Sequence, residues 1–397
     1  MISVTEAKKL ITRNTKLLKA NPLELKEAYG CVLSENVISP VNLPLFDQSA
    51  MDGYAIVYAD YIKKKQIKIK GEIAAGQHFK RKILSGSAVR IYTGAQIPSG
   101  ADTVVMQEKT ELNNNELIIK DANLKKGSNI RSLGSQIKKG HLALQKGNRL
   151  TAGSIGYLAA MGITSIKAFS KPRIITITTG SELVKPGKKL HPGKIYESNS
   201  YALIAALQSI HIEPLNSVSV NDNEDIILNS IRLSLQKADI VLITGGISVG
   251  DYDFVGSSLK KLGVKNIFYK IKQKPGKPLF FGKSGETLVF ALPGNPAAVL
   301  SCFYEYVFPA IQLIQGRKDA FIKKIKLPIS KDYSKNKGLS FFLKGKISDN
   351  TVIPLEGQES FVLSSFAVAD CMIYLPEESE NIKAGELVEV HILPGLI

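Results

Sequence analysis

The chain has few of the residues from which several common kinds of site are built. Its 397 residues include only three cysteines, Cys31, Cys302 and Cys371, which lie far apart and form no Cys-x-x-Cys pair. This pattern indicates neither a disulfide framework nor a structural zinc site, and it fits a reducing compartment. The five histidines are scattered without metal-ligand spacing, and Gly-x-Ser-x-Gly and P-loop motifs are absent. A zinc enzyme is therefore disfavoured.

The chain also lacks a membrane address. Its first residues contain no apolar stretch of the kind found in signal peptides. The most apolar long segment, residues 296–314, is interrupted by Glu305 and Pro309 and is short for a span. We therefore expect a cytoplasmic protein that does not interact with a membrane. Apolar content of 44% excludes a disordered chain, and the length predicts two to four domains.

Acidic residues are scarce, since 35 Asp and Glu stand against 52 Lys and Arg, a formal net charge of +17. Nucleic-acid binding is the obvious reading, but 44 of the basic residues are Lys and no known nucleic-acid-binding motif appears. We expect no nucleic-acid partner and a Lys-rich, solvated surface for most of the charge. Residues 254–285 contain eight Lys and no acid beside a glycine-rich loop, which indicates a small anionic ligand there.

The order of patterns along the chain predicts a domain inserted into another. Ser3 and Glu6 form a capping-box spacing before an apolar periodicity that reaches Leu18, and Pro22 is expected to end this helix or start the next. Short strand-like runs separated by turn residues follow from residue 46. Residues 150–161 form a helix pattern without an apolar core nearby, and we expect this helix to pack on the N-terminal one.

Strand and helix patterns alternate from residue 172, which predicts a parallel α/β domain. Strands are expected at 174–178, 212–220 and 239–243, and helices at 199–210, 223–237 and 254–262. Asn295 is expected to cap a helix that starts at Pro296. After residue 317 no helical period survives, which predicts a small all-β domain.

The strongest local signal is a buried strand that ends in Thr244, Gly245 and Gly246. Ligands of open α/β sheets bind at this edge, and glycines let the backbone approach a phosphate. Asp251 and Asp253 follow, and carboxylates beside a phosphate favour a divalent cation between them. The alternative is an ordinary turn with acidic capping residues.

Basic residues gather in the next part of the chain. If residues 270–274 are extended, Lys270, Lys272 and Lys274 share one face, which indicates an anion site. Pro275 and Gly276 are expected to turn the chain and to separate Lys277 from this face. The alternative is a solvated basic edge strand. Glu182, Asp222 and the segment 292–296 follow other strands. Each is individually typical of a turn or a cap, but together they bring acids and free amides to the same edge.

Six segments together resemble one family, and they occur in its order over essentially the whole chain. They are Phe46-Asp-Gln-Ser-Ala-Met-Asp-Gly-Tyr54, Val89-Arg-Ile-Tyr-Thr-Gly-Ala95, Gly100-Ala-Asp-Thr-Val-Val-Met-Gln-Glu108, Gly245-Gly-Ile-Ser-Val-Gly-Asp-Tyr-Asp253, Lys274-Pro-Gly-Lys-Pro278 and Leu292-Pro-Gly-Asn-Pro296. The chain resembles the molybdopterin molybdenumtransferase (MoeA) family, which includes the gephyrin E domain.

The resemblance implies a multidomain α/β subunit in four parts. These are an elongated helical N-terminal domain (1–45 plus 138–168), an inserted β-rich domain (46–137), a molybdopterin-binding α/β domain with a parallel-rich sheet (169–316) and a C-terminal β-barrel-like domain (317–397). It further implies a homodimer with the site between subunits. The implied reaction inserts molybdate into adenylylated molybdopterin and releases AMP, with Mg²⁺ as cofactor.

The resemblance also implies roles for single residues. The catalytic set would comprise Glu182, Asp222, Asp253, Lys270 and Lys274, with Asp52 and Thr93 supplied by the partner subunit. Glu182 and Asp253 would bind the cation. The substrate-binding set would comprise Thr244, Gly245, Gly246, Ser248, Lys277, Pro293, Gly294, Asn295, Pro296 and Ser360.

The chain departs from the family pattern at a few positions. Ser135-Gln136 replaces the usual Glu-Asp, Ser181 replaces Asp, Ala298 replaces Ser, and Lys344 stands where an Arg is expected. Two other readings of the same residues remain open, namely an adenylyltransferase acting on molybdopterin and a non-enzymatic scaffold that retains the fold.

Overall fold

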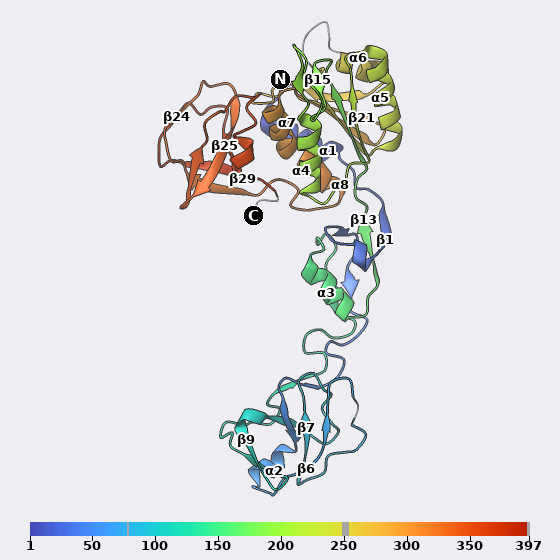
Figure 1. The fold of residues 1–397 in the computed structure, drawn as a ribbon, viewed down its shortest axis with the longest axis vertical. Coiled ribbons are helices and arrows are strands. Elements are labelled where there is room, and N and C mark those ends of the chain that lie inside the picture. Colours follow the sequence, from blue (N-terminus) through green and yellow to red (C-terminus); the bar gives the residue numbers. More distant parts are fainter. Residues whose placement is uncertain (78, 248–253, 395–397) are drawn as a thin grey trace.

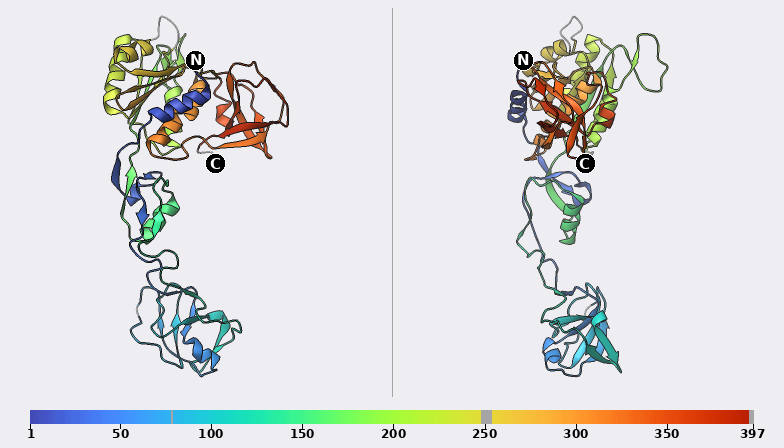
Figure 2. Two further views of the ribbon diagram at one scale, coloured as in Figure 1. Left: turned by 180° about the vertical axis from the view of Figure 1, so that it is seen from behind. Right: turned by 90° about the vertical axis from the view of Figure 1, so that its left-hand side faces the viewer.

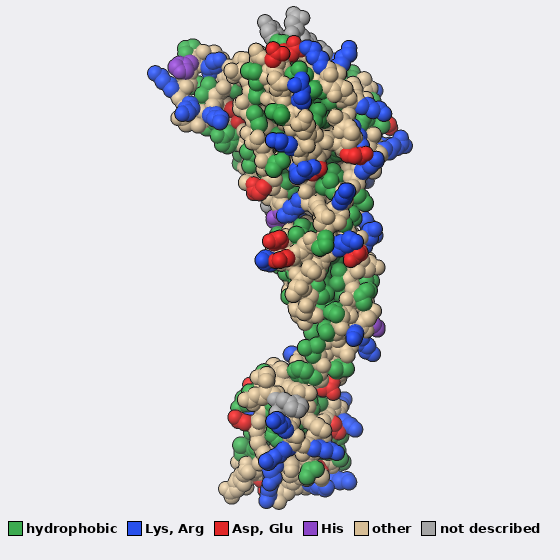
Figure 3. All heavy atoms as spheres, turned by 90° about the vertical axis from the view of Figure 1, so that its right-hand side faces the viewer, with side chains coloured by type: hydrophobic (Ala, Val, Ile, Leu, Met, Phe, Trp, Pro, Cys, Tyr) green, Lys and Arg blue, Asp and Glu red, His purple; other side chains and the backbone are tan. Residues whose placement is uncertain are grey.

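The computed structural model describes residues 1–77, 79–247 and 254–394 of an elongated molecule. Figure 1 shows a broad end that contains an α/β unit and an all-β unit, a slender middle, and a second β unit at the opposite end. The expected multidomain α/β fold is confirmed. On the face drawn in Figure 3, Lys and Arg side chains are spread over the whole length and interspersed with acids.

The α/β unit is built on a six-stranded sheet in the order β17-β14-β18-β22-β21-β19. Strands β17 (Asn216–Val220), β14 (Ile174–Thr179), β18 (Ile240–Thr244) and β22 (Thr287–Leu292) are parallel, and β21 (Phe280–Ser284) and β19 (Lys265–Tyr269) run antiparallel at one edge. All residues of β14 and β18 are buried. Runs of apolar and β-branched residues that are buried throughout are typical of strands covered on both faces. The sheet is thus parallel-rich, as predicted.

Helices cover both faces of this sheet. One core contains α4 (Asn199–Gln208) and α7 (Pro296–Cys302), and a second contains α5 (Glu224–Lys237) and α6 (Phe254–Lys261). The side chain of Asn223 accepts a hydrogen bond from the backbone N–H of Ile226 and caps α5 at the predicted start of the helix. The predicted strand at 212–220 is shorter, since β17 begins at residue 216.

The apolar segment 296–314 is a continuous helical run in the broad end. Helix α7 continues through a π-helical turn (Phe303–Val307) into α8 (Phe308–Ile314). The run is long and apolar enough to cross a membrane by length and composition, but 83% of its apolar window is buried inside the protein. A core helix passes the same test, and this burial is typical of one.

Two predictions about the N-terminal helix are wrong. The capping residue is right, because Ser3 accepts a hydrogen bond from the N–H of Glu6, but α1 (Val4–Asn14) ends before the apolar period does. Pro22 lies in strand β1 (Ala20–Glu24) rather than at a helix boundary. The apolar face of α1 packs into the α/β core, and Ile11 is fully buried there. Amphipathic spacing defines the apolar face of a helix but not its partner.

Helix α3 (Ala152–Ala160) therefore does not pack on α1. Its Leu158 lies in a separate core with Leu25 and Leu33, beside the small sheet of β1, β13 (Ser165–Phe169) and β2 (Val32–Leu33). Residues from before and after the inserted unit meet in this core and form the slender middle (Figure 1).

The unit at the far end has a six-stranded sheet in the order β8-β5-β7-β6-β10-β9. The strands are β5 (Gly53–Ile56), β6 (Lys68–Ile73), β7 (Ser87–Ile91), β8 (Thr103–Met106), β9 (Thr110–Asn113) and β10 (Glu116–Ile119), with α2 (Tyr58–Ile62) beside them. Strands β9 and β10 form a hairpin, and Asn114 and Asn115 adopt positive φ in its turn. Asn tolerates this conformation better than most residues.

The all-β unit of the broad end follows residue 317. Strands β25 (Ser340–Ser348), β27 (Cys371–Leu375), β29 (Leu387–Ile392) and β23 (Lys324–Pro328) form its sheet, and β26 (Thr351–Pro354) pairs with β25. The sheet is completed by β20 (Gln273–Lys274), which belongs to the α/β part of the chain and runs parallel to Ser340 and Phe341. This pairing joins the two units of the broad end.

Candidate functional site

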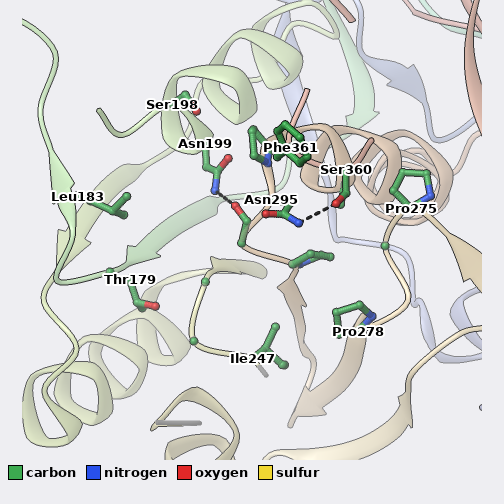
Figure 4. A pocket seen from close by; sticks show the side chains of 18 of the residues that line it. Thr179, Leu183, Ser198, Asn199, Ile247, Pro275, Pro278, Asn295, Ser360 and Phe361 are labelled. Atoms are coloured by element: carbon green, nitrogen blue, oxygen red, sulfur yellow. Dashed lines mark hydrogen bonds between the residues drawn. The ribbon is translucent and has the colours of Figure 1, made fainter. Parts of the chain in front are cut away.

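A cleft of about 1070 Å³ lies at the carboxyl edge of the α/β sheet. Segments that follow β14, β17, β18 and β22 line it, and the all-β unit contributes Leu339, Ser360 and Phe361. Figure 4 shows Thr179, Ile247 and Asn295 around this cleft, with Ser360 beside Asn295. The position is the one expected for ligands of open α/β sheets.

Glycines form part of the cleft wall because side chains do not fit there. Gly245 has a φ of +85°, and a Cβ atom on it would lie 2.4 Å from the carbonyl oxygen of Thr179. On Gly246, with a φ of +59°, a Cβ atom would lie 2.8 Å from a methyl carbon of Val255. A ligand can therefore approach the backbone at this turn, as a phosphate group requires.

Buried polar atoms near the cleft lack partners among the described residues. They are the hydroxyl oxygens of Thr179 and Thr244 and the amide oxygen of Asn199. The amide nitrogen of Asn199 donates to the carbonyl oxygen of Gly294 at 2.8 Å, which holds the oxygen in place (Figure 4). Since an unpaired buried polar group is costly, these atoms favour a polar ligand in the cleft.

Two carboxylates that line the cleft are those of Glu182 and Asp222. Asp222 is fixed by a reciprocal pair, because the N–H of Ser181 donates to its carboxylate at 2.9 Å and its own N–H donates to the hydroxyl of Ser181 at 3.1 Å. A third lining carboxylate, Glu197, accepts from the N–H and hydroxyl of Ser200 at 2.7 and 2.6 Å. Glu182 and Asp222 are thus the acids better placed to face a ligand.

The lysines do not form the predicted single face. Lys270 has a φ of +67°, so the stretch is not extended there, and the Lys272 ammonium pairs with Glu377 at 2.8 Å. Neither lines the cleft, whereas Lys274 and Lys277 both do. Pro275 and Gly276 therefore bring Lys277 to the cleft instead of turning it away. The prediction of a single face is wrong because alternate residues share a face only within a regular strand.

The loop that carries Ser360 is tied to the α/β unit at the start of α7. The carbonyl oxygen of Ser360 accepts from the N–H groups of Ala297 and Ala298 at 3.1 and 3.3 Å, and its hydroxyl accepts from the Asn295 amide at 2.7 Å. Asn295 occupies the predicted N-cap position, but its side chain makes no capping hydrogen bond. The Ser360 carbonyl satisfies the free helix N–H groups instead.

A buried lysine holds the same loop from the other side. Lys344 is 1% exposed, and its ammonium donates to the carbonyl oxygens of Gly357, Glu359 and Val362 at 2.6, 3.2 and 3.3 Å. Burial lowers the pKa of this ammonium. The three acceptors fix the backbone on both sides of Ser360, so the all-β unit presents Ser360 and Phe361 to the cleft in a defined geometry.

Asp52 and Thr93 lie in the β unit at the opposite end of the molecule (Figures 1 and 2). The carboxylate of Asp52 accepts from the N–H and the hydroxyl of Thr93 at 2.7 and 2.8 Å, and these bonds lower the pKa of Asp52. The guanidinium of Arg90 stacks nearby on Tyr54 and Tyr92, with 4.9 and 5.3 Å to the ring centroids. Asp52 and Thr93 therefore do not reach the cleft of their own chain.

The structure places most other predicted site residues at the cleft. Those that line it are Glu182, Asp222, Gly245, Gly246, Lys274, Lys277, Pro293, Gly294, Asn295, Pro296 and Ser360. Thr244 is fully buried behind the lining. Ser248 and Asp253 lie outside the described residues.

Sequence reasoning missed several lining residues, including Asn199, Gln273 and Phe361. The sequence predicts only a helix start at Asn199, and an Asn at such a position is equally typical of a helix terminus without a ligand. Phe361 follows Ser360 and is 66% exposed. A single Phe in a loop gives no sequence signal of a binding surface, because scattered apolar residues on a protein surface are normal.

The donors fit a hard divalent cation in part. Glu182 and Asp222 supply carboxylate oxygens, and the unpaired hydroxyl of Thr179 lines the same cleft, which is the oxygen chemistry that Mg²⁺ prefers. Within the described ranges, no group of three or more His, Cys, Asp and Glu is placed to hold a metal ion. Asp251 and Asp253 fall outside those ranges.

Comparison with protein families gives three matches that follow one another along the chain. Residues 2–162 match the MoeA N-terminal region (domain I and II), residues 175–313 match a probable molybdopterin binding domain, and residues 326–393 match the MoeA C-terminal region (domain IV).

Individual proteins resemble the chain over most of its length. A molybdopterin molybdenumtransferase of Haemophilus influenzae is 37% identical over 376 residues, covering 93% of this chain and 92% of the relative. One of Staphylococcus epidermidis is 33% identical over 98% of this chain and 95% of the relative. The crystal structure of a molybdopterin biosynthesis MoeA protein from Pyrococcus horikoshii superposes with a TM-score of 0.83 at 29% identity, covering 99% of this chain and all of that one.

Proposed function

The chain belongs to the MoeA family, and we propose that its cleft transfers molybdenum from molybdate to adenylylated molybdopterin and releases AMP. The curated relatives are named molybdopterin molybdenumtransferase. The observation that carries the proposal is the composition of the cleft. Lys274 and Lys277 lie at the same cavity as the glycine turn at Gly245 and Gly246, at the sheet edge where phosphates bind.

The charges of the cleft suit two anionic reactants. The ammonium groups of Lys274 and Lys277 would hold phosphate and molybdate oxygens, since each is a compact cation with several donors. Asp222, oriented by Ser181, would position the pterin or ribose end by accepting hydrogen bonds. Such a site accelerates transfer by positioning and by stabilising charge, without a protein nucleophile.

Mg²⁺ dependence is part of the proposal. Glu182 supports it as a cleft carboxylate, and Asp253 is the second proposed ligand. When bound, the cation would polarise the phosphoanhydride and neutralise charge on its oxygens. Omission of Mg²⁺ is expected to abolish AMP release, and full activity in excess chelator would remove the cation from the proposal.

A homodimer is also proposed, with Asp52 and Thr93 of a second copy completing each cleft. The separation of these residues from the cleft of their own chain supports this arrangement (Figure 1). Mixing two inactive variants, D52N and K274M, tests it. After subunit exchange, roughly half of the dimers are mixed, and each mixed dimer has one intact site of two. Roughly a quarter of wild-type activity is therefore expected. No recovery would contradict a shared site.

A cytoplasmic location is proposed on the state of the cysteines. All three are free and buried, which suits a compartment that keeps thiols reduced. Cell fractionation that finds the protein in an oxidising compartment would contradict this assignment.

The transfer itself is tested with a matched pair of lysine variants. Purified protein is supplied with adenylylated molybdopterin, Mg²⁺ and molybdate, and AMP release is followed. K274M is expected to lose activity on the order of 100-fold, because one charged donor to the reacting group is removed. K272M is the control, since Lys272 pairs with Glu377 away from the cleft. Equal activities for the two variants would remove Lys274 from the site.

The same assay separates the alternatives. Pyrophosphate release from ATP and molybdopterin would favour an adenylyltransferase. A cleft that binds molybdopterin without releasing AMP would favour a non-enzymatic scaffold.

A further inference from the structure

A buried amide lies directly beneath the lysine loop, which we define as residues 274–278. Gln273 is 1% exposed, and its side-chain nitrogen donates to the carbonyl oxygens of Pro275 and Gly276 at 3.0 and 3.3 Å. Its side-chain oxygen accepts from the hydroxyl of Tyr306, in the π-helical turn after α7. A buried amide with both ends engaged fixes the groups around it in one arrangement.

Tyr306 determines which way the amide of Gln273 points. Its side chain is fully buried, and burial raises its pKa well above the ordinary value. The hydroxyl therefore stays protonated and acts as a hydrogen-bond donor. The amide oxygen therefore faces Tyr306, and the amide nitrogen must face the loop. In the flipped orientation the oxygen would meet two carbonyl oxygens, an arrangement without a hydrogen atom to share.

The loop rests closely on this support. Gly276 has a φ of +89°, and a Cβ atom on it would lie 2.4 Å from the sulfur of Cys302 and 2.8 Å from the side-chain nitrogen of Gln273. The carbonyl oxygens of Pro275 and Gly276 are held toward the core, whereas Lys274 and Lys277 line the cleft. Figure 4 shows Pro275 and Pro278 at the edge of the cleft.

From these contacts we propose that Gln273 and Tyr306 are positioning residues that set the affinity of the cleft for its anionic substrate by holding the lysine loop. Tyr306 acts only through Gln273, and Gln273 acts through the backbone of the loop. The proposal rests on the proposed function, because it concerns the binding of a phosphoanhydride substrate by Lys274 and Lys277.

The main test is the Tyr306→Phe variant, which removes only the hydroxyl. The KM for adenylylated molybdopterin is expected to rise about fivefold to tenfold, as for the loss of one hydrogen bond, equivalent to roughly 1–1.4 kcal/mol. The kcat is expected to stay within about twofold, because a bound substrate still meets the same groups. Tyr304→Phe is the matched control, since it removes a hydroxyl from the same helical turn, where Tyr304 packs on Phe303 at 5.4 Å between ring centroids.

A purely structural role gives a different result. Loss of folded protein lowers kcat and leaves KM unchanged, and this outcome for Tyr306→Phe would overturn the proposal. A double-mutant cycle gives the second readout. In a Gln273→Leu background, which already lacks the amide, the change Tyr306→Phe is expected to alter KM by less than about twofold. Additive effects of the two substitutions would overturn the proposed route through Gln273.

Pyrophosphate binding, measured by calorimetry, separates this inference from the proposed reaction. Weaker binding by Tyr306→Phe and unchanged binding by Tyr304→Phe support the positioning role, even if wild-type protein releases no AMP and the proposed function fails. Equal pyrophosphate affinity for wild type and Tyr306→Phe, or an absence of binding by wild type, overturns the inference.

Discussion

A buried ion network between α1 and the all-β unit gives a quantitative prediction for the Glu305→Gln variant. The Glu305 side chain is 1% exposed and pairs with the ammonium of Lys8 and, at 2.5 Å, with the imidazole of His391, which is also 1% exposed. Burial alone would raise the pKa of Glu305, but Lys8 and His391 lower it from 4.5 to about 2. Opposing charges thus outweigh desolvation at this position.

The shifted pKa sets the size of the effect. A fall from 4.5 to about 2 corresponds to about 3 kcal/mol, at roughly 1.4 kcal/mol for each tenfold change in acidity. Breaking a buried pair by removing one partner usually costs about 3–5 kcal/mol. We therefore expect Glu305→Gln to lower the free energy of unfolding by about 3 kcal/mol at pH 6.

The pH dependence follows from the directions of two shifts. The contribution of Glu305 to the free energy of unfolding is present above the unfolded-state pKa of 4.5 and is lost as the pH falls toward 2. Burial would lower the pKa of His391, but Glu305 and Glu389 raise it above 6.5. The contribution of His391 is present below 6.5 and is lost as the pH rises through the raised pKa. The stability gap between wild type and Glu305→Gln is thus widest between these limits.

Urea unfolding measured at several pH values tests this prediction. Since the chain contains no Trp, far-UV circular dichroism reports unfolding, and hydrogen exchange of β29 localises it. Glu286→Gln is the control, because Glu286 is 68% exposed in its pair with Lys16, so solvent screens the pair and the free energy of unfolding should change far less than in Glu305→Gln. Equal losses for the two variants, or a gap that does not change with pH, would refute the reasoning.

Three further substitutions test local features of the fold and the cleft. Gly53→Ala places a Cβ atom 1.9 Å from the carbonyl oxygen of Val105, so it should destabilise the far-end β unit by about 3 kcal/mol and speed hydrogen exchange in β5 and β8; unchanged exchange would contradict the close approach. Lys344→Met removes the charged donor shared by three carbonyl oxygens, should cost about 1–3 kcal/mol and should expose the Ser360 loop to proteases; a loop as resistant as in wild type would show that Lys344 does not hold it. Gly246→Ala puts a Cβ atom against Val255 and Thr179 at positive φ, so pyrophosphate affinity should fall by about tenfold or more, while wild-type affinity would deny a role for this turn.

Much of the fold was predictable because local patterns determine it. Buried strands such as β14 and β18 are runs of β-branched and apolar residues, and the caps at Ser3 and Asn223 follow from residue type and spacing. The partner of each helix was not predictable in this way. Helix α1 and helix α3 each have an apolar face, and only the three-dimensional arrangement shows that these faces lie in different cores.

The candidate site was predictable where it follows strand ends and less so elsewhere. Glu182, Asp222 and the glycine turn follow parallel strands, whose carboxyl ends meet at one edge. The shared face predicted for Lys270, Lys272 and Lys274 is wrong because Lys270 has a positive φ, which breaks the alternation of side chains along the chain. Ser360 was indicated only by the family resemblance and Gln273 not at all, because both reach the cleft through contacts between segments distant in sequence, which no local pattern encodes.

The central claim is that the cleft at the edge of the α/β sheet carries out molybdenum transfer. The most direct measurement follows AMP and protein-bound molybdenum in one reaction with molybdate, Mg²⁺ and adenylylated molybdopterin. AMP and molybdenum-loaded cofactor are expected to appear in equal amounts, and both are expected to decline on the order of 100-fold in K274M but not in K272M. AMP release without molybdenum incorporation, or incorporation unaffected by K274M, would contradict it.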